Sequence, residues 1–389
     1  MFSMSSEKIA SKRKYLYGVD LMRLLFILGV LIIHTSTVFT YKFQVGSASF
    51  LTLGSFHMPM HFTRMGFMFI SGLVLFLNSY NRPMHLIKFW KRRYFWVLIP
   101  YFFWNFIYHL VEHDFEKIST GNWWLQYWDL LIHGNGYYMY FLMVMLQLYL
   151  CYPLMRFLFK KTEGKHLIVF FCSIAIQLLI TIFTKFIFPH LATENWPYLF
   201  KSYGMFVLTY EGYFIAGALA GIHYSDVEKW IVSHIKQLFI ATLIGIPTMV
   251  LYYFYNIYIL KLSYNKAYEV HQPLIVVYAL IVISNIFYVG YLYDRFVKNN
   301  KHPKLIAFVS KAQKIAFGLY LTQTIALSIL RIMIIPIPNG SWYIWLIWPL
   351  ATIFVIGFSA ALCWILYNTP IAHYVIGRPL NKRGTNVRI

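Results

Sequence analysis

Long apolar stretches separated by short polar turns dominate the sequence from Leu21 onward. Most of them are about twenty residues long, the length at which an α-helix crosses the hydrocarbon core of a bilayer. The pattern predicts an all-α, polytopic integral membrane protein with about ten transmembrane helices. The predicted helices cover residues 21–39, 58–77, 94–108, 138–158, 167–188, 202–222, 235–255, 273–293, 315–335 and 342–367.

The composition agrees with a membrane protein. The chain of 389 residues is 59% hydrophobic and only 12% charged, and its mean hydropathy of +0.58 is above the range of soluble domains. No linker divides it, so we expect an N-terminal tail (1–17), one ten-helix domain (18–370) and a C-terminal tail (371–389). We expect no cleavable signal peptide, because the first seventeen residues are polar and basic and no small-residue cleavage site follows the first apolar run.

The formal net charge of +21 comes from 34 lysines and arginines. Most of them lie in turns on one side of the predicted bundle, above all in the turn between the second and third helices. The positive-inside rule makes this side cytoplasmic and predicts that both termini are cytoplasmic. The basic charge therefore indicates topology and attraction to anionic membrane lipid, and it predicts no nucleic-acid partner.

The first predicted helix carries three ionisable side chains, Asp20, Arg23 and His34. Arg23 and His34 are separated by about 16 Å and by roughly 20° of rotation, and Asp20 lies one turn before Arg23 on that face. Unpaired polar groups in hydrocarbon cost several kcal/mol. The face is therefore predicted to look into the protein or into water.

Arg64 and Glu211 are predicted at the same depth as His34, on two other helices. One interpretation is structural: Arg64 and Glu211 form a buried ion pair, and His34 is a hydrogen-bonded core residue. The other is catalytic. His34 would act as general base or acid, Arg64 would hold an oxyanion or a carbonyl, and Glu211 would orient His34 or balance Arg64.

Two further groups of residues are candidates for binding or packing. Arg23, together with Lys88, Arg92 and Arg93 of the basic turn, forms a cytoplasmic cluster suited to the phosphates of a nucleotide-bearing donor. Positive-inside charge alone is the competing interpretation of that turn. Ser71 and Gly72 form a small pair that would let a neighbouring helix approach closely.

The remaining polar positions predict no further site. His57 and His61 share a helix face, but without a third ligand they do not predict a metal site. Gln147, Gln177 and Gln323 are typical of hydrogen bonds between helices. No phosphate-binding, dinucleotide, serine-hydrolase or zinc-protease motif occurs in the sequence.

Several short motifs carry a resemblance to a known family. They are the D-x-x-R and R-x10-H of Asp20, Arg23 and His34, and the strings RMGFMFISG, WKRRYFWVLIPYFFWNF, FGLYLTQ and YNTPIAHYVIGR. With these motifs the chain resembles the membrane acyltransferase family 3, and most closely its intercellular-adhesion C subgroup of biofilm polysaccharide operons. Two positions depart from the family pattern: Trp96 stands where a second arginine is usual, and Gln323 stands where a late histidine is usual.

The resemblance implies a bacterial plasma-membrane enzyme that moves an acyl group from cytoplasmic acyl-CoA to a hydroxyl of a cell-surface or lipid-linked polysaccharide. It implies an acetyl or, second, a succinyl group, with acyl-CoA as a substrate and no tightly bound cofactor. The partners would be a carbohydrate acceptor and a polysaccharide synthase. Two other functions stay open: a polysaccharide exporter without chemistry, and a structural subunit of a synthase complex. The few charged residues within the spans lie near one depth, which favours a site over a wide polar path.

Overall fold

The computed structural model describes residues 15–112, 121–134, 136, 138–299 and 302–378, and these contain helices and no strand. Nine helical stretches of this part are long and apolar enough to cross a membrane. The prediction of an all-α polytopic membrane protein is confirmed. The predicted tails, 1–17 and 371–389, lie mostly outside the described residues.

The helices follow one another with short connections. The long ones are α1 (Tyr17–Thr40), α3 (Phe62–Ser79), α4 (Leu86–Glu112), α6 (Tyr140–Lys161), α7 (His166–Ile182), α11 (Ile235–Tyr258), α13 (Pro273–Lys298), α14 (Pro303–Met333) and α15 (Ile344–Asn368). The shorter ones are α2 (Ala48–Met60), α5 (Gly121–His133), α8 (Tyr198–Lys201), α9 (Glu211–Ile222), α10 (Tyr224–Ser233) and α12 (Tyr264–Ala267).

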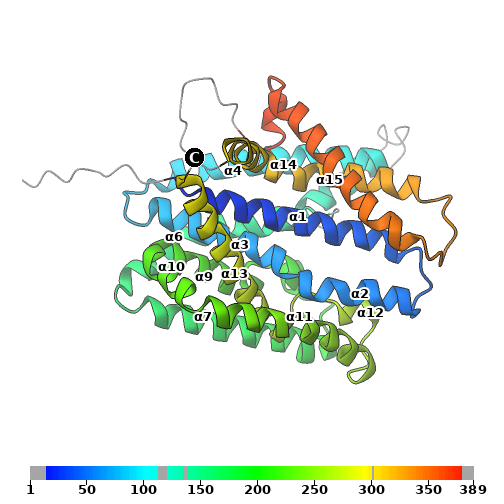
Figure 1. Cartoon of the computed structure of the whole chain (residues 1–389), viewed down its shortest axis with the longest axis horizontal. Helices are drawn as coiled ribbons and strands as arrows, with labels where there is room; N and C mark the ends of the chain where they lie inside the picture. Colours follow the sequence, from blue (N-terminus) through cyan, green and yellow to red (C-terminus); the bar gives the residue numbers. More distant parts are fainter. Residues whose placement is uncertain (1–14, 113–120, 135, 137, 300–301, 379–389) are drawn as a thin grey trace, which may run out of the picture.

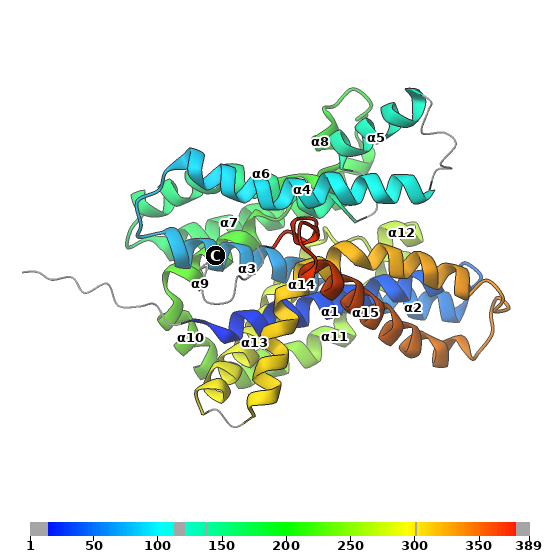
Figure 2. The same cartoon turned by 90° about the horizontal axis from the view of Figure 1, so that it is seen from above.

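Helix α1 runs through the middle of the bundle and contacts α2, α3, α13, α14 and α15 (Figure 1). Seen from above, α4 and α6 lie on one side of α1 and α3, and α10, α11 and α13 lie on the other (Figure 2). Tyr15 and Arg378 lie close together at one end of the bundle. We call this end, where α4 begins with its basic residues, the basic end, and the opposite one the outer end.

The second predicted span extends further than its hydropathy indicates. Helices α2 and α3 meet at His61, two residues after Pro59, and together form one apolar stretch of 32 residues. Proline lacks the amide hydrogen that the preceding helical turn needs as a donor, so the helix is interrupted there. Arg64 therefore lies in the first turn of α3, just after the interruption.

The sixth predicted span, 202–222, is helical only in its second half. Two 3₁₀ turns, η4 (Tyr203–Met205) and η5 (Val207–Thr209), precede α9. Gln147 of α6 donates to the Met205 carbonyl and accepts from the Val207 amide, and Gln177 of α7 does the same for the Thr209 carbonyl and the Gly212 amide. Irregular backbone inside a membrane protein needs such partners, because lipid offers none.

The positions of the chain ends require an even number of crossings. Tyr15 and Arg378 lie at the same end, whereas nine crossings would place them at opposite ends. The stretch from α8 through α9 therefore makes the tenth crossing. The number of crossings in the structure is therefore the predicted ten, although one crossing is only partly helical.

Helices α3 and α9 touch backbone to backbone. A Cβ atom added to Gly217 of α9 would lie 1.9 Å from the Phe69 carbonyl oxygen of α3, and one added to Gly72 of α3 would lie 2.1 Å from the Phe214 carbonyl oxygen of α9. Small residues allow helices in membranes to pack this closely. The contact fixes the register between α3, which carries Arg64, and the segment that precedes α9.

We predict that Gly217→Ala destabilises the protein by about 1 to 3 kcal/mol, because its methyl group must push α3 away from α9. The matched control is Gly357→Ala in α15, where an added Cβ meets nothing within 4 Å. Thermal unfolding in detergent measures both variants. Equal melting temperatures for the two variants would contradict the α3–α9 packing.

Candidate active site

His34 lies in the outer part of α1, six residues and about 9 Å before the helix ends at Thr40. The ring of Tyr138, just before α6, stacks on the His34 imidazole with 3.7 Å between centroids and 10° between planes. This stacking fixes the plane of the imidazole. The two ring nitrogens then differ in what they face.

Gln323 of α14 determines which nitrogen of His34 carries the hydrogen. The Gln323 amide nitrogen donates to the Tyr320 carbonyl at 3.0 Å, which turns its oxygen toward His34. That oxygen lies 2.9 Å from His34 Nδ1 and can only accept, so Nδ1 is the donor. Neutral His34 therefore has an unprotonated Nε2.

The Nε2 atom of His34 is the open nitrogen. It has no hydrogen-bond partner among the described residues, and it is not among the buried polar atoms without a partner. His34 as a whole is half-buried although it lies inside the bundle. Nε2 therefore keeps some accessible surface, and no described residue donates to its lone pair.

Arg64 lies close enough to His34 for its charge to act on the imidazole. Its guanidinium carbon is 5.0 Å from the centre of the Tyr140 ring, and its donors lie beside the Tyr210 hydroxyl. None of the ion pairs in the described part of the chain includes Arg64. A half-buried guanidinium with neutral neighbours can bind an oxyanion without first leaving a carboxylate.

Glu211 does not form the expected contact with Arg64 or His34. It is the first residue of α9, and its Oε2 atom accepts a hydrogen bond of 2.7 Å from Ser173 of α7. Consecutive residues at the start of α9 point in different directions, so Tyr210 reaches Arg64 while Glu211 faces α7. The prediction that Glu211 balances Arg64 or orients His34 thus has no support from its contacts.

His57 of α2 and His61, which joins α2 to α3, belong to the wall of this site. His57 Nε2 lies 2.9 Å from the Ser36 hydroxyl, and His61 Nε2 donates to the Tyr268 carbonyl at 2.7 Å. The described residues contain no group of three His, Cys, Asp or Glu side chains that could hold a metal ion. His34 can act as a base in this arrangement, and Arg64 can stabilise negative charge that develops on a group bound next to them.

At the basic end, Asp20 holds several groups together. Its carboxylate accepts from the Tyr15 hydroxyl at 2.6 Å and forms an ion pair of 3.3 Å with Arg23. Arg378 lies near both Asp20 and Arg23, and it donates to the Gln313 carbonyl of α14 at 3.3 Å. Arg23 and Arg378 thus lie beside the carboxylate of Asp20, and the carboxylate of Asp294 of α13 lies close to Gly18 in the first turn of α1.

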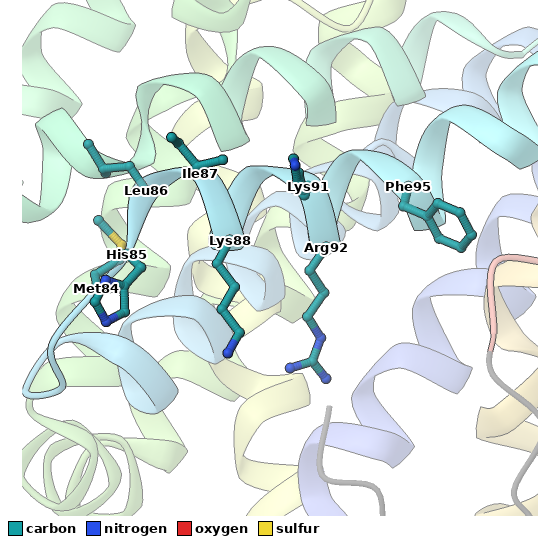
Figure 3. A pocket seen from close by; sticks show the side chains of 8 residues that line it. All are labelled: Met84, His85, Leu86, Ile87, Lys88, Lys91, Arg92 and Phe95. Atoms are coloured by element: carbon teal, nitrogen blue, oxygen red, sulfur yellow. The ribbon is translucent and has the colours of Figure 1, made fainter.

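The predicted basic turn is helical from Leu86 onward, eight residues before the predicted start of the third helix, so its cations lie on two faces of α4. Lys88 and Arg92, one helical turn apart, extend to the same side and line an open groove of about 970 Å³ together with His85 (Figure 3). Arg93 instead lies 5.7 Å from the Tyr149 ring of α6. The geometry therefore brings together Lys88 and Arg92 and not Arg93.

The remaining predicted residues support packing. Ser71 donates to the Phe67 carbonyl within its own helix, and Gly72 gives α9 its close approach. Tyr138, Tyr140, Tyr210 and Arg378 were not among the predicted site residues. The strings FGLYLTQ and YNTPIAHYVIGR were signals for two contacts that were missed, since the first contains Gln323 and the second ends on Arg378.

We predict that Gln323→Leu lowers the rate of the reaction that uses His34 by about tenfold. Without the hydrogen bond from Nδ1 to Gln323, neither the tautomer nor the orientation of the imidazole is fixed. Gln323→Glu keeps an acceptor oxygen at this position and should retain activity. Turnover of purified, folded variants is the measurement. If the leucine and glutamate variants lose the same activity, Gln323 does not act through its oxygen.

We predict that Glu211→Gln leaves both folding and turnover close to those of the unchanged protein. Glutamine keeps an oxygen that can accept from Ser173, and no ion pair in the described residues includes Glu211. Turnover and the melting temperature measured together are the check. A folded Glu211→Gln protein without activity would show that the carboxylate takes part in the reaction.

Comparison with known proteins gives one match. The family model described as an acyltransferase domain, of acyltransferase family 3, matches residues 16–368. No curated protein and no solved structure matches the chain. The matched range includes His34, Arg64, Gln323 and the groove of Lys88 and Arg92. Since the model covers nearly the whole chain, this membrane protein belongs to the acyltransferase 3 family.

Proposed function

We propose that the protein is a membrane O-acyltransferase that moves an acyl group from acyl-CoA to a hydroxyl of a cell-surface or lipid-linked polysaccharide. The observation that carries the proposal is the open Nε2 of His34 beside Arg64, which has no carboxylate partner in the described chain. Acyl transfer needs a base for the hydroxyl and a positive group for the oxyanion. The family supplies the reaction class.

In the proposed reaction, His34 Nε2 takes the proton of the acceptor hydroxyl as its oxygen attacks the thioester carbonyl. A carbon–oxygen bond forms, and Arg64 binds the negative oxygen of the tetrahedral intermediate. The carbon–sulfur bond then breaks, and the thiolate takes the proton from His34 Nε2. The products are an ester and free CoA, and His34 returns to its neutral form.

The two substrates would approach from opposite ends of the bundle. Lys88 and Arg92, whose charges suit the phosphates of CoA, lie at the basic end. His34 lies about 9 Å from the outer end of α1, so it is close to the end from which the acceptor would approach. The acyl arm would therefore extend up α1 from Arg23 toward His34.

The finer assignments follow from the resemblance to the intercellular-adhesion C proteins. We propose a bacterial plasma membrane as the location, an acetyl or succinyl group as the acyl group, and a polysaccharide synthase as a partner. The exporter and the structural subunit are the alternatives that the experiment below must exclude. Both alternatives leave the esterification of the polysaccharide unchanged.

We predict that His34→Ala abolishes ester formation, since loss of a general base costs about 10² to 10⁴ in rate. Arg64→Lys keeps the charge, loses the two-pronged donor geometry and should lose most of the rate. The measurement is mass analysis of the surface polysaccharide, with amount and ester content determined together. Cells without the protein give the baseline.

Arg331→Lys, at the exposed outer end of α14, is the matched control and should keep normal esters. Normal amounts of polymer without esters in the His34 and Arg64 variants would support the enzyme. Scarce polymer with normal esters would instead show that the protein exports it. Normal polymer with normal esters in both variants would remove His34 and Arg64 from any essential role.

A further inference from the structure

A second cleft opens at the basic end, where the end of α3 meets the start of α10. Its volume is about 320 Å³. Leu77 and Ile222 give it apolar surface, and Asn78, Asn81, Tyr224 and Ser225 give it polar groups. The reaction described above does not use these residues.

The polar groups of the cleft suit the edge of a planar heterocycle. The Asn78 amide nitrogen donates to the Val74 carbonyl at 2.9 Å, which leaves its oxygen as an acceptor. Asn81 is exposed, and no hydrogen bond within the described chain involves its amide. An asparagine amide presents a donor and an acceptor side by side, the pattern that pairs with adenine.

Hydrogen bonds from Arg156 hold the turn that carries Asn81 in place. Arg156 of α6 donates to the Ser79 carbonyl at 3.2 Å and to the Tyr80 carbonyl at 3.0 Å. These bonds also satisfy carbonyl groups at the end of α3 that have no helical partner. The cleft is thus a preformed feature, as binding sites for small molecules usually are.

Along the chain, the cleft is followed directly by the groove of Lys88 and Arg92, although the two share no lining residue. Asn81 of the cleft and Met84 of the groove are three positions apart, so their Cα atoms lie within about 11 Å of each other. Lys88 and Arg92 extend to the same side of α4 (Figure 3). A nucleotide with its base in the cleft would have its phosphates on the side of the cations.

We propose that this cleft is the subsite for the purine base of the acyl donor, with Asn81 on the edge of the base and Lys88 and Arg92 on the phosphates. The inference rests on the proposed function, because it assumes a donor that carries a nucleotide. It adds a recognition site for the part of the donor furthest from the reacting carbonyl. Binding energy from that part would hold the thioester arm in the bundle.

The test compares two donors on purified protein in lipid nanodiscs: acetyl-CoA, and S-acetylpantetheine, which has the thioester arm and no nucleotide. Asn81→Ala should raise the KM for acetyl-CoA about tenfold, the loss expected for one pair of hydrogen bonds. Ser225→Trp, which fills the cleft from an exposed position, should do the same. The KM for S-acetylpantetheine should not change in either variant.

The matched control is Asn368→Ala, an exposed asparagine at the end of α15 that lines neither groove. An unchanged KM for acetyl-CoA in both cleft variants would overturn the subsite, and so would an equal rise for the two donors. If the unchanged protein uses neither donor, the proposed function fails by itself. Binding of adenosine 3′,5′-diphosphate then decides the subsite: loss of binding in Asn81→Ala supports it, and no binding to the unchanged protein overturns it.

Discussion

A guanidinium that cannot lose its charge lies inside an apolar bundle with no carboxylate beside it in the described chain, and the site is built around this constraint. Arg64 is accommodated by the ring of Tyr140 and the hydroxyl of Tyr210, which lower the cost of burying a cation without cancelling its charge. A carboxylate here would stabilise the resting protein better. It would also compete with any anion that forms during a reaction.

The same preference for neutral partners extends to His34. An amide oxygen fixes its tautomer where a carboxylate would also make it a stronger base. The carboxylate of Asp20 is instead at the basic end, and that of Glu211 faces α7. No carboxylate among the described residues therefore pairs with Arg64 inside the bundle. Asp20 and Glu211 instead form contacts that join neighbouring segments.

The membrane spans were predictable from sequence because each long helix carries its own apolar pattern, independent of its neighbours. The broken first half of the 202–222 span was not predictable in this way. Hydropathy averages over side chains and does not detect that Gln147 and Gln177 replace the helical hydrogen bonds of the backbone.

Within the site, counting residues along helices predicts His34 and Arg64 at one depth, and the charge of Arg64 acts on the His34 ring. Counting could not give the direction of Glu211, which depends on where α9 begins. The pairing of His34 with Gln323 joins residues 289 positions apart, and no local spacing predicts such a contact. The place of Arg378 beside Asp20 likewise depends on how the last segment returns to α1.

The short helix α9 bears on how the protein is made. Its twelve residues rise about 18 Å, well below the roughly 30 Å of hydrocarbon that a helix must cross to be retained by itself. Its docking partners, α3 and α7, are both synthesised before it, so it can enter the bilayer against surfaces that are already present. The orientation of α11, α13, α14 and α15 in the membrane then depends on that docking, and a failure there would invert about the last two fifths of the chain.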